Sequence, residues 1–193
     1  MKRICVNCGS SPGFDHAFLA MARRLGRTLA EQGLELVYGG ADVGLMRAVA
    51  DAALQAGGKV IGVIPKVFAH KVSHAGLTEL HVVGSMHERK QMMFDLSDGF
   101  IALPGGLGTV EEITELLTWS QLGINRKPCG MLNVAGYYDQ FLSFLDHAVK
   151  SGFLKQEHRD MLMVSEDPDN LVARFRAYTA PAIEKWVGVR LRP

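Results

Sequence analysis

Short apolar runs alternate with amphipathic stretches along most of the sequence, and this alternation constrains the fold more than any other feature. Residues 60–64 and 100–103 are almost continuously apolar and have the length of strands. Strands of that kind are usually buried on both faces, as in parallel sheets. Segments with helical periodicity separate them. The sequence therefore predicts an α/β fold: a single domain with a doubly wound parallel sheet between two layers of helices.

The expected elements follow from these periodicities and from Gly, Pro and capping residues at their ends. Strands are expected at residues 3–8, 34–38, 60–64, 80–83 and 100–103, and near residues 131 and 163–164. Helices are expected at residues 16–32, 45–56, 85–97, 109–122, 138–151 and 168–178, with a loop at 66–78 that could include a short helix. Residues 1–180 form the expected domain, and residues 181–193 a C-terminal tail.

Composition excludes several classes of protein. The chain has 193 residues, of which 48% are hydrophobic, so it can build a sizeable core. A formal net charge of +1 gives no general reason to expect nucleic acid or a membrane surface as a partner. No run of 18 apolar residues predicts a membrane span, and the N-terminal residues lack the pattern of a signal peptide. We expect a cytoplasmic protein.

The three cysteines do not indicate a disulfide framework or a metal site. Cys5 and Cys8 form a C-x-x-C pair, but both lie in the first expected strand. Side chains three positions apart in a strand point to opposite faces, so the two thiols should not share a metal or a disulfide. The histidines show no H-E-x-x-H spacing. We therefore expect no metal.

The segment PGGLGTVEE, residues 104–112, follows a buried strand and leads into a helix expected to begin at Thr109. Gly105, Gly106 and Gly108 leave the backbone open to close approach. The first amides of a helix lack partners and favour an anion, most often a phosphate. The alternative is a tight strand-to-helix turn without a ligand. The pattern is neither a Walker A motif nor G-x-G-x-x-G.

Two glutamates follow these glycines. At 100° per residue, Glu111 falls opposite the apolar stripe of the helix, toward solvent. Glu112 falls at the flank of the stripe and can face the ligand. Thr109 and Glu112 also have the spacing of a capping box, in which Glu112 would only cap the helix. From its position alone, Glu112 could either cap the helix or act in catalysis.

A second cluster lies at residues 85–90, SMHERK. Arg89 projects into the middle of an apolar helix face, where an unpaired charge would be very costly. A phosphate or a carboxylate would satisfy its guanidinium, and Glu112 is the obvious candidate. The alternative is a purely structural salt bridge.

Other glycines also lie between a strand and a helix. Gly39 and Gly40 do so in the segment YGGADVGLM, residues 38–46, where the alternative is helix–sheet packing. Ligands of doubly wound folds bind at the carboxyl ends of the strands. Gly9 and Ser10 end the first expected strand, so we expect all of these segments to meet at one rim.

PGGLGTVEE resembles the P-G-G-x-G-T-x-x-E signature of the Lonely guy (LOG) family of cytokinin riboside 5′-monophosphate phosphoribohydrolases, often labelled lysine decarboxylases. Met86-His87-x-Arg89-Lys90 is similar to the family's M-H-x-R-K, and residues 38–46 to its second glycine motif. The likeness extends over residues 3–178. Ala41 and Arg47 depart from it, because glycine is common at both positions.

The resemblance implies a Rossmann-like homodimer that hydrolyses the N-glycosidic bond of N6-modified adenosine 5′-monophosphates, or of AMP, without a cofactor. It implies Arg89 and Glu112 as catalytic residues. The expected substrate-binding residues, including those of the rim, are Gly9, Ser10, Gly39, Gly40, Met86, Lys90, Pro104, Gly105, Gly106, Gly108 and Thr109. The expected partner is a small-molecule nucleotide, with neither nucleic acid nor membrane.

Three rival functions remain at this stage. A decarboxylase using pyridoxal phosphate would need a Schiff-base lysine, and Lys90 is the lysine nearest to the motifs. A carrier protein would bind a nucleotide or cofactor without hydrolysing it. A nucleoside deoxyribosyltransferase would need a second base as acceptor.

Overall fold

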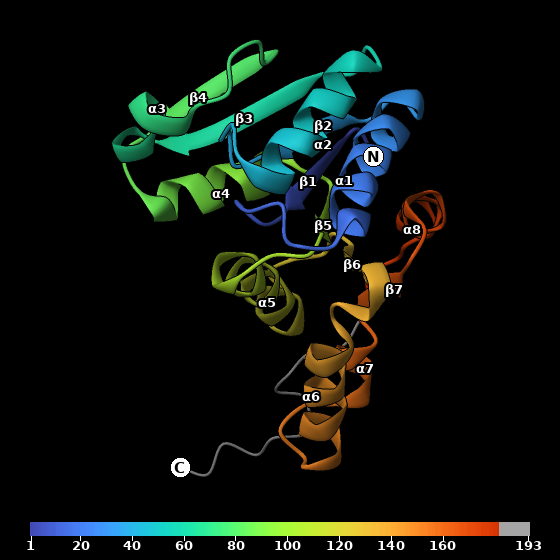
Figure 1. Ribbon diagram of the computed structural model, residues 1–193. Helices are drawn as coiled ribbons and strands as arrows, with labels where there is room; N and C mark the ends of the chain where they lie inside the picture. Colours follow the sequence, from blue (N-terminus) through green and yellow to red (C-terminus); the bar gives the residue numbers. More distant parts are fainter. Residues whose placement is uncertain (182–193) are drawn as a thin grey trace.

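The computed structural model of the protein describes residues 1–181. Its strands form one parallel sheet of seven strands in the order β4-β3-β2-β1-β5-β6-β7 (Figure 1). Their bounds are β1 (Arg3–Asn7), β2 (Glu35–Tyr38), β3 (Val60–Pro65), β4 (Glu79–Val83), β5 (Gly99–Ala102), β6 (Cys129–Leu132) and β7 (Leu162–Ser165). This is the predicted single α/β domain. Apart from Pro181, the expected tail lies outside the described residues.

Helices connect successive strands. Their bounds are α1 (His16–Glu31), α2 (Gly44–Gln55), α3 (Lys66–Val72), α4 (Met86–Leu96), α5 (Leu107–Gln121), η1 (Val134–Gly136), α6 (Asp139–Lys150), α7 (Gln156–Arg159) and α8 (Pro168–Arg176). The expected strands and long helices are confirmed to within about two residues at each end, the usual uncertainty of such boundaries. The short elements η1 and α7 were not expected. None of the helices within residues 1–181 is both long and apolar enough to cross a bilayer.

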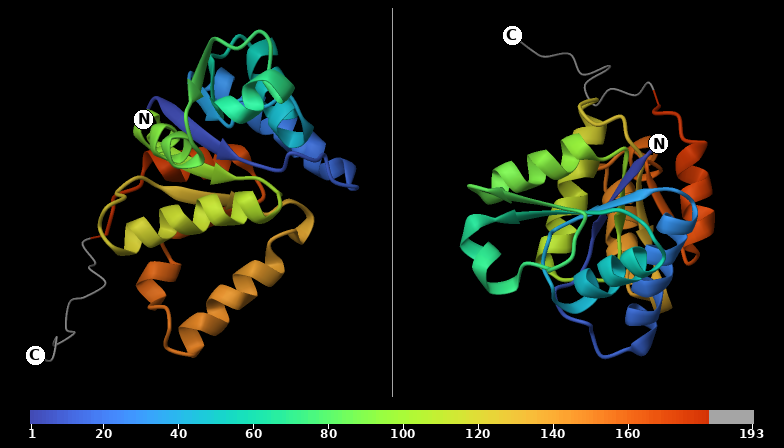
Figure 2. Two further views of the ribbon diagram at one scale, coloured as in Figure 1. Left: turned by 90° about the vertical axis from the view of Figure 1, so that its left-hand side faces the viewer. Right: turned by 90° about the horizontal axis from the view of Figure 1, so that it is seen from above.

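The sheet separates two apolar clusters. One packs α1, α2 and α8 against one face, and the other packs α4 and α5 against the opposite face (Figure 2). Cys5 belongs to the second cluster, whereas Cys8 packs against the first. The prediction that these two thiols point to opposite faces of the sheet is therefore confirmed, and both are free thiols.

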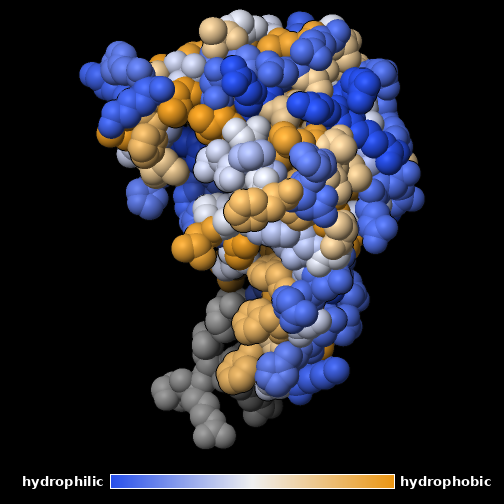
Figure 3. Space-filling model, viewed as in Figure 1, coloured by the Kyte–Doolittle hydropathy of each residue, from blue (hydrophilic) through white to orange (hydrophobic). Residues whose placement is uncertain are grey.

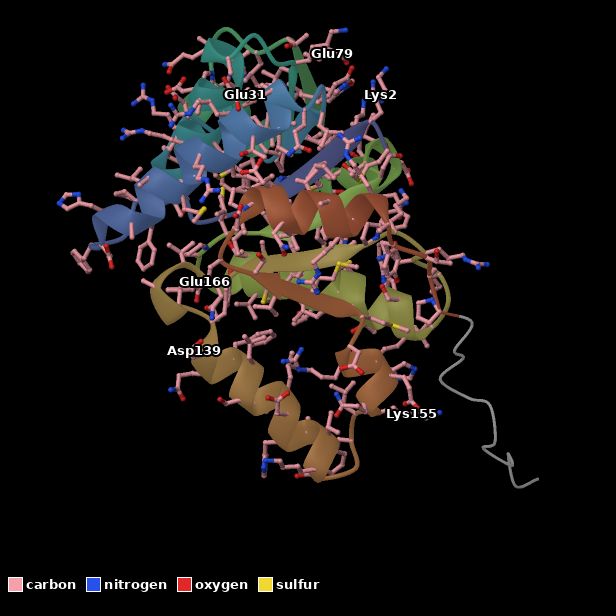
Figure 4. The ribbon with its side chains drawn as sticks, turned by 90° about the vertical axis from the view of Figure 1, so that its right-hand side faces the viewer. Lys2, Glu31, Glu79, Asp139, Lys155 and Glu166 are labelled. Atoms are coloured by element: carbon pink, nitrogen blue, oxygen red, sulfur yellow. The ribbon has the colours of Figure 1, made fainter. Side chains whose placement is uncertain are left out.

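The helix α8 lies beside α1 on one side of the sheet, as Figure 4 shows. Arg24 of α1 forms ion pairs with Asp167 and Asp169 at the start of α8, at 2.9 and 3.1 Å. These contacts connect the N-terminal half of the sheet to its C-terminal half.

The helices α6 and α7 lie side by side at the end of the molecule remote from α3 and β4 (Figure 1). No residue of α6 is buried, although Phe141, Leu142 and Leu145 pack against the second cluster. Hydrophobic side chains gather along one side of this region and hydrophilic ones along the other (Figure 3).

The direction of winding reverses between β1 and β5. The chain moves outward from β1 to β4, then crosses back by α4 to place β5 on the other side of β1. Doubly wound folds bind ligands at the carboxyl ends of the strands at this reversal. In this chain those ends lead into Gly9-Ser10 and Pro104-Gly105-Gly106. The topology therefore brings two of the predicted segments together.

Gly26 allows α1 and α2 to approach closely. A Cβ at this position would lie 2.3 Å from the carbonyl oxygen of Val49 and 3.0 Å from the backbone nitrogen of Ala53. Both atoms belong to the backbone of α2, so the two helices would have to move apart.

We expect Gly26→Ala to lower the free energy of unfolding by about 1–3 kcal/mol, the usual effect of overpacking. In an unhindered helix, the same replacement stabilises by about 0.4–1 kcal/mol. Gly108→Ala in α5 is the matched control, because no atom lies within 4 Å of the added carbon. Urea unfolding of both variants measures the difference. Equal stability of the two variants would contradict the proposed packing constraint.

Candidate active site

A cleft of about 310 Å³ opens at the carboxyl ends of β1 and β5. This volume is at the lower end of the usual range for small-molecule sites. Nine of the predicted site residues line it: Gly9, Ser10, Gly39, Met86, Arg89, Gly106, Gly108, Thr109 and Glu112. They come from four separate segments of the chain, which were expected to meet at one rim of the sheet.

Four predicted site residues lie outside the lining of this cleft, and three of them shape the backbone around it. The carbonyl of Pro104 accepts a hydrogen bond from the amide of Gly9 at 3.0 Å. A Cβ at Gly105 would lie 2.1 Å from Oγ1 of Thr109. Gly40 has a φ of +74°, which favours glycine. Lys90, the fourth, extends toward α5 and pairs with carboxylates there.

Arg89 is held in place from two sides. Its Nη1 donates to Oε1 of Glu112 at 2.6 Å, and its Nε donates to the carbonyl of Val63 at 3.2 Å. The residue is only 9% exposed. The expectation that this guanidinium needs a partner is confirmed, and the partner in the structure is the candidate carboxylate, Glu112. Within the described residues, Nη2 makes no hydrogen bond and remains free to donate to a ligand.

The start of α4 fixes the position of Arg89 along the chain. Ser85 caps the helix, with its hydroxyl accepting from the amide of Glu88 at 3.1 Å. The carboxylate of Glu88 accepts from the amide of Gly84 at 2.6 Å. This arrangement is close to a capping box, except that the glutamate accepts from the residue before the cap. Arg89 consequently lies on the inner face of the helix, with Met93 one turn further on.

Glu112 lies between the cleft and the protein interior. Its side chain is 14% exposed, whereas that of Glu111 is 55% exposed. The predicted difference in orientation between the two glutamates is therefore confirmed. Burial raises the pKa of Glu112 above its ordinary value, and the ion pair with Arg89 offsets part of that rise. The site thus holds a carboxylate that is harder to ionise than a surface glutamate.

The capping-box interpretation of Glu112 is wrong. The helix α5 begins at Leu107, two residues earlier than expected, and its N-cap is Gly106. Thr109 is therefore already in the first turn, and the carboxylate of Glu112 bonds to Arg89 instead of a cap amide. A glycine at the N-cap provides no side chain to accept hydrogen bonds.

The first amides of α5 are consequently available to an anion. Leu107 and Gly108 are exposed at the cleft, and no side chain caps this end of the helix. The hydroxyl of Thr109 makes no hydrogen bond within residues 1–181 and belongs to the same lining. These free donors and the helix dipole suit a phosphate group.

The second glycine segment packs against both the first strand and Arg89. The amide of Leu45 donates to the carbonyl of Gly9 at 3.0 Å. A Cβ at Gly44 would lie 2.4 Å from the backbone of Ser10. A Cβ at Gly39 would lie 2.2 Å from Nη2 of Arg89. Gly44 thus lets the start of α2 approach the turn after β1, whereas Gly39 makes room for the arginine.

The two departures from the family pattern lie at the edge of this segment. Ala41 forms an isolated antiparallel bridge with Ser73. Arg47 points away from the cleft and pairs with Asp42 at 2.9 Å and with Asp51 at 3.8 Å. Neither side chain lines the cleft.

Sequence reasoning missed several residues of the site. Val6, Asn7, Cys8, Met46 and Leu107 also line the cleft. The buried Asn7, 4% exposed, ends β1 at the reversal of the sheet, and that position was the signal available in the sequence. Burial raises the pKa of the Cys8 thiol, so this cysteine is a neutral part of the wall.

Tyr137 is a further missed residue. Its hydroxyl donates to the carbonyl of Gly105 at 2.6 Å, from a turn that follows β6. Its ring packs edge-on against Phe18 of α1, with the ring centroids 5.4 Å apart. Tyr137 therefore braces the glycine turn from outside the cleft.

The structure gives little support to the pyridoxal phosphate alternative. The ammonium of Lys90 lies 2.5 Å from Glu111 and 3.0 Å from Glu115, outside the cleft lining. A Schiff-base lysine has to reach its cofactor as a neutral amine. Among residues 1–181, no group of three or more His, Cys, Asp or Glu side chains is arranged to hold a metal ion.

We expect Gly39→Ala to reduce kcat/KM by at least about tenfold while the protein stays folded. The new methyl group meets the ends of two flexible side chains, Arg89 and Met46, and no backbone. The guanidinium of Arg89 has to move, and a displacement of about 1 Å in a group that takes part in a reaction can cost about 10²-fold in rate. Steady-state kinetics and thermal unfolding test this. Full activity in a folded variant would show that the position of Nη2 is unimportant.

Known proteins resemble this chain over nearly its whole length. The family described as possible lysine decarboxylase matches residues 46–175. A cytokinin riboside 5′-monophosphate phosphoribohydrolase of Rhodococcoides fascians is 48% identical over 178 residues, covering 91% of this chain and 90% of the relative. The enzyme of the same name, LOG, from Oryza sativa subsp. japonica is 46% identical over 178 residues, covering 92% and 74%.

Solved structures have the same fold. The molybdenum cofactor binding protein of Rippkaea orientalis superposes with a TM-score of 0.69 at 26% identity, covering 92% of this chain and 97% of that protein. The molybdenum cofactor carrier protein of Chlamydomonas reinhardtii superposes with a TM-score of 0.68 at 23% identity, covering 91% of this chain and 96% of that protein. At this level of identity the likeness concerns the fold alone. From the identity and coverage of its sequence relatives, the chain belongs to the LOG family of cytokinin riboside 5′-monophosphate phosphoribohydrolases.

Proposed function

We propose that the protein hydrolyses the N-glycosidic bond of N6-modified adenosine 5′-monophosphates, and of AMP itself, giving the free base and ribose 5-phosphate. The observation that carries the proposal is the pairing of Arg89 with Glu112 beside the uncapped N-terminus of α5, in one cleft. Relatives with 45–48% identity carry the name of this reaction.

The phosphate of the substrate would bind at the start of α5. Amides of residues 107–109 and the hydroxyl of Thr109 can all donate to it. Glycines at positions 106 and 108 leave room for its approach, because no side chain extends from them. Anchoring the phosphate here places the ribose near Glu112, one turn further along the helix.

Glu112 would then act at the sugar. Breaking the glycosidic bond gives the ribose oxocarbenium character, and an ionised carboxylate stabilises that charge. The base leaves with the bonding electrons and takes up a proton. Water adds to the anomeric carbon and releases a proton, and Glu112 is placed to orient that water and accept the proton.

Arg89 would serve two purposes. Through Nη1 it fixes the carboxylate and favours its ionised form, against the burial that raises the pKa of Glu112. Through the free Nη2, near Gly39, it can contact the substrate at the opposite wall of the cleft. The other predicted residues that line the cleft, Ser10 and Met86 among them, would form the walls around the nucleotide.

Product analysis tests the proposal directly. Purified protein is incubated with AMP and with isopentenyladenosine monophosphate, and the products are separated by chromatography. We expect free base and ribose 5-phosphate in equal amounts without any added acceptor base. A requirement for a second base would indicate a deoxyribosyltransferase.

The matched variant for this assay is Glu112→Gln, which keeps the shape of the side chain. We expect its kcat to fall by about 10² or more, the usual contribution of one acid–base group. Circular dichroism and thermal unfolding confirm that the variant is folded. Undiminished turnover would remove Glu112 from the mechanism.

The pH profile reports the ionisation of Glu112. Because burial raises the pKa of Glu112 and the ionised form is required, kcat should fall as the pH drops through that raised pKa. The acidic limb should therefore lie above about pH 4.3, where an ordinary glutamate titrates. Measuring kcat for AMP over the range in which the protein stays folded gives the limb. A kcat that rises toward acidic pH would instead make protonated Glu112 the active form.

A carrier that binds a nucleotide or cofactor without hydrolysis is the second candidate. Its supporting observation is the likeness to the molybdenum cofactor binding protein at 26% identity. The same assay separates the two candidates, because a carrier would bind AMP in calorimetry and release no adenine. The LOG relatives are much more similar in sequence, which favours the hydrolase.

We also propose a homodimer in the cytoplasm that acts on small nucleotides, with no nucleic acid or membrane partner. Phe144 of α6 is 62% exposed, and Phe153 after the helix is 90% exposed. A contiguous apolar patch is typical of a protein–protein contact, and hydrophobic side chains gather along one side of this region (Figure 3). The net charge of +1 supports a partner other than nucleic acid.

A further inference from the structure

Lys90 follows Arg89 on α4, but it makes a separate connection to α5. Its ammonium donates to Oε1 of Glu111 at 2.5 Å and to Oε1 of Glu115 at 3.0 Å. The Lys90 side chain is 14% exposed, so this is a half-buried ion-pair network and differs from a loose surface contact. Two of its three N–H donors are occupied.

The two carboxylates that Lys90 contacts flank Glu112 on α5. Glu111 precedes Glu112 by one residue, and Glu115 follows it by three, almost one helical turn. Arg89 and Lys90 therefore divide three carboxylates between them. Arg89 takes the one that faces the cleft, and Lys90 takes the two on either side of it.

This arrangement matters because Glu112 has to ionise close to other negative charges. The side chain of Glu115 is 30% exposed and that of Glu111 is 55% exposed. A bound substrate phosphate at the start of α5 would add further negative charge. Like charges nearby disfavour the ionised form of a carboxyl group.

Charged and titratable groups face Glu112 from α4, from α5 and from the region of β1. The helix α4 presents the positive Arg89 and Lys90, and α5 presents Glu111 and Glu115. The strand β1 presents the neutral thiol of Cys5, and the turn that follows it presents that of Cys8; burial raises the pKa of both thiols. Among the smaller influences on the pKa of Glu112, after burial and Arg89, Glu111 raises it and Lys90 lowers it.

The side chains of Lys90 and Glu112 are both largely withdrawn from solvent, each being 14% exposed. Both line a small cavity of about 20 Å³ between α4 and α5, together with Asn7, Glu115 and Trp119. Charges on side chains that are so little exposed are screened less than charges at the surface. The electrostatic influence of Lys90 on Glu112 is therefore not removed by bulk water.

We propose that Lys90 is a positioning residue: it fixes α5 against α4 and compensates Glu111 and Glu115, so that Glu112 ionises in the working pH range. This assignment differs from a direct role of Lys90 in binding the substrate. It rests on the proposed function, in which ionised Glu112 is the active form.

The test compares Lys90→Met with Lys90→Arg and Glu111→Gln, using AMP as substrate across the pH range. In Lys90→Met the acidic limb should move to higher pH. On that limb kcat should fall about threefold to tenfold, and on the alkaline plateau it should stay within about twofold of the parent. Lys90→Arg should restore the parent profile. Glu111→Gln should move the limb to lower pH, because it removes the opposing charge.

A second measurement does not depend on catalytic activity. The side-chain carboxyl of Glu112 can be followed by carbon NMR during a pH titration of protein labelled with ¹³C-glutamate, with Glu112→Gln identifying the signal. Its midpoint should rise in Lys90→Met and fall in Glu111→Gln. This readout holds even if the protein acts on another substrate.

Two results would overturn the proposal. A higher KM for AMP with an unchanged pH profile in Lys90→Met would make Lys90 a substrate ligand. A lower thermal midpoint with unchanged kcat, KM, pH profile and Glu112 titration would leave only a structural clamp. If the protein released no free base from AMP, the proposed function would fail, and if Glu112→Gln kept full activity, only the catalytic role of Glu112 would fail; in both cases the NMR result would still decide the electrostatic role of Lys90.

Discussion

The half-buried ion pair between Arg89 and Glu112 is the interaction on which the rest of the site depends. Two charges so far from bulk water are stable only with close mutual contact and further hydrogen bonds. The protein meets this requirement with the 2.6 Å contact and with the carbonyl of Val63 behind the guanidinium. The same requirement fixes α4 relative to α5, and it leaves no room for a side chain at position 39 while Arg89 keeps its place. The ion pair between Arg89 and Glu112 therefore determines both the arrangement of the candidate site and the packing of α4 against α5.

The location of this pair follows from topology. The chain reverses its winding between β1 and β5, and α4 crosses the sheet to make that reversal. The crossing helix brings Arg89 to the cleft, and the helix after β5 brings Glu112. Neither residue is near the other in the sequence, being 23 positions apart. The fold alone does not determine the chemistry, because molybdenum cofactor binding proteins have the same architecture.

Much of this could be predicted from sequence, and the exceptions have identifiable causes. Apolar runs gave the strands, and the cost of an unpaired guanidinium on an apolar face predicted that Arg89 has a partner. The start of α5 was placed at Thr109 because threonine is a good N-cap; the helix instead begins at Leu107, since the cap is a glycine. Tyr137 could not be found, because its contact with Gly105 spans 32 residues and depends on how β6 ends. The contacts of Lys90 were missed for the same reason: they require the spacing between two helices.

The central claim is that a nucleotide binds with its phosphate at the start of α5 and its ribose beside Glu112. A crystal structure of the Glu112→Gln variant with AMP tests it most directly. We expect the phosphate within hydrogen-bond distance of the amides of residues 107–109. The anomeric carbon should lie about 3–4 Å from the side chain of residue 112, as a near-attack geometry requires. A ribose bound away from both residue 112 and Arg89 would contradict the account.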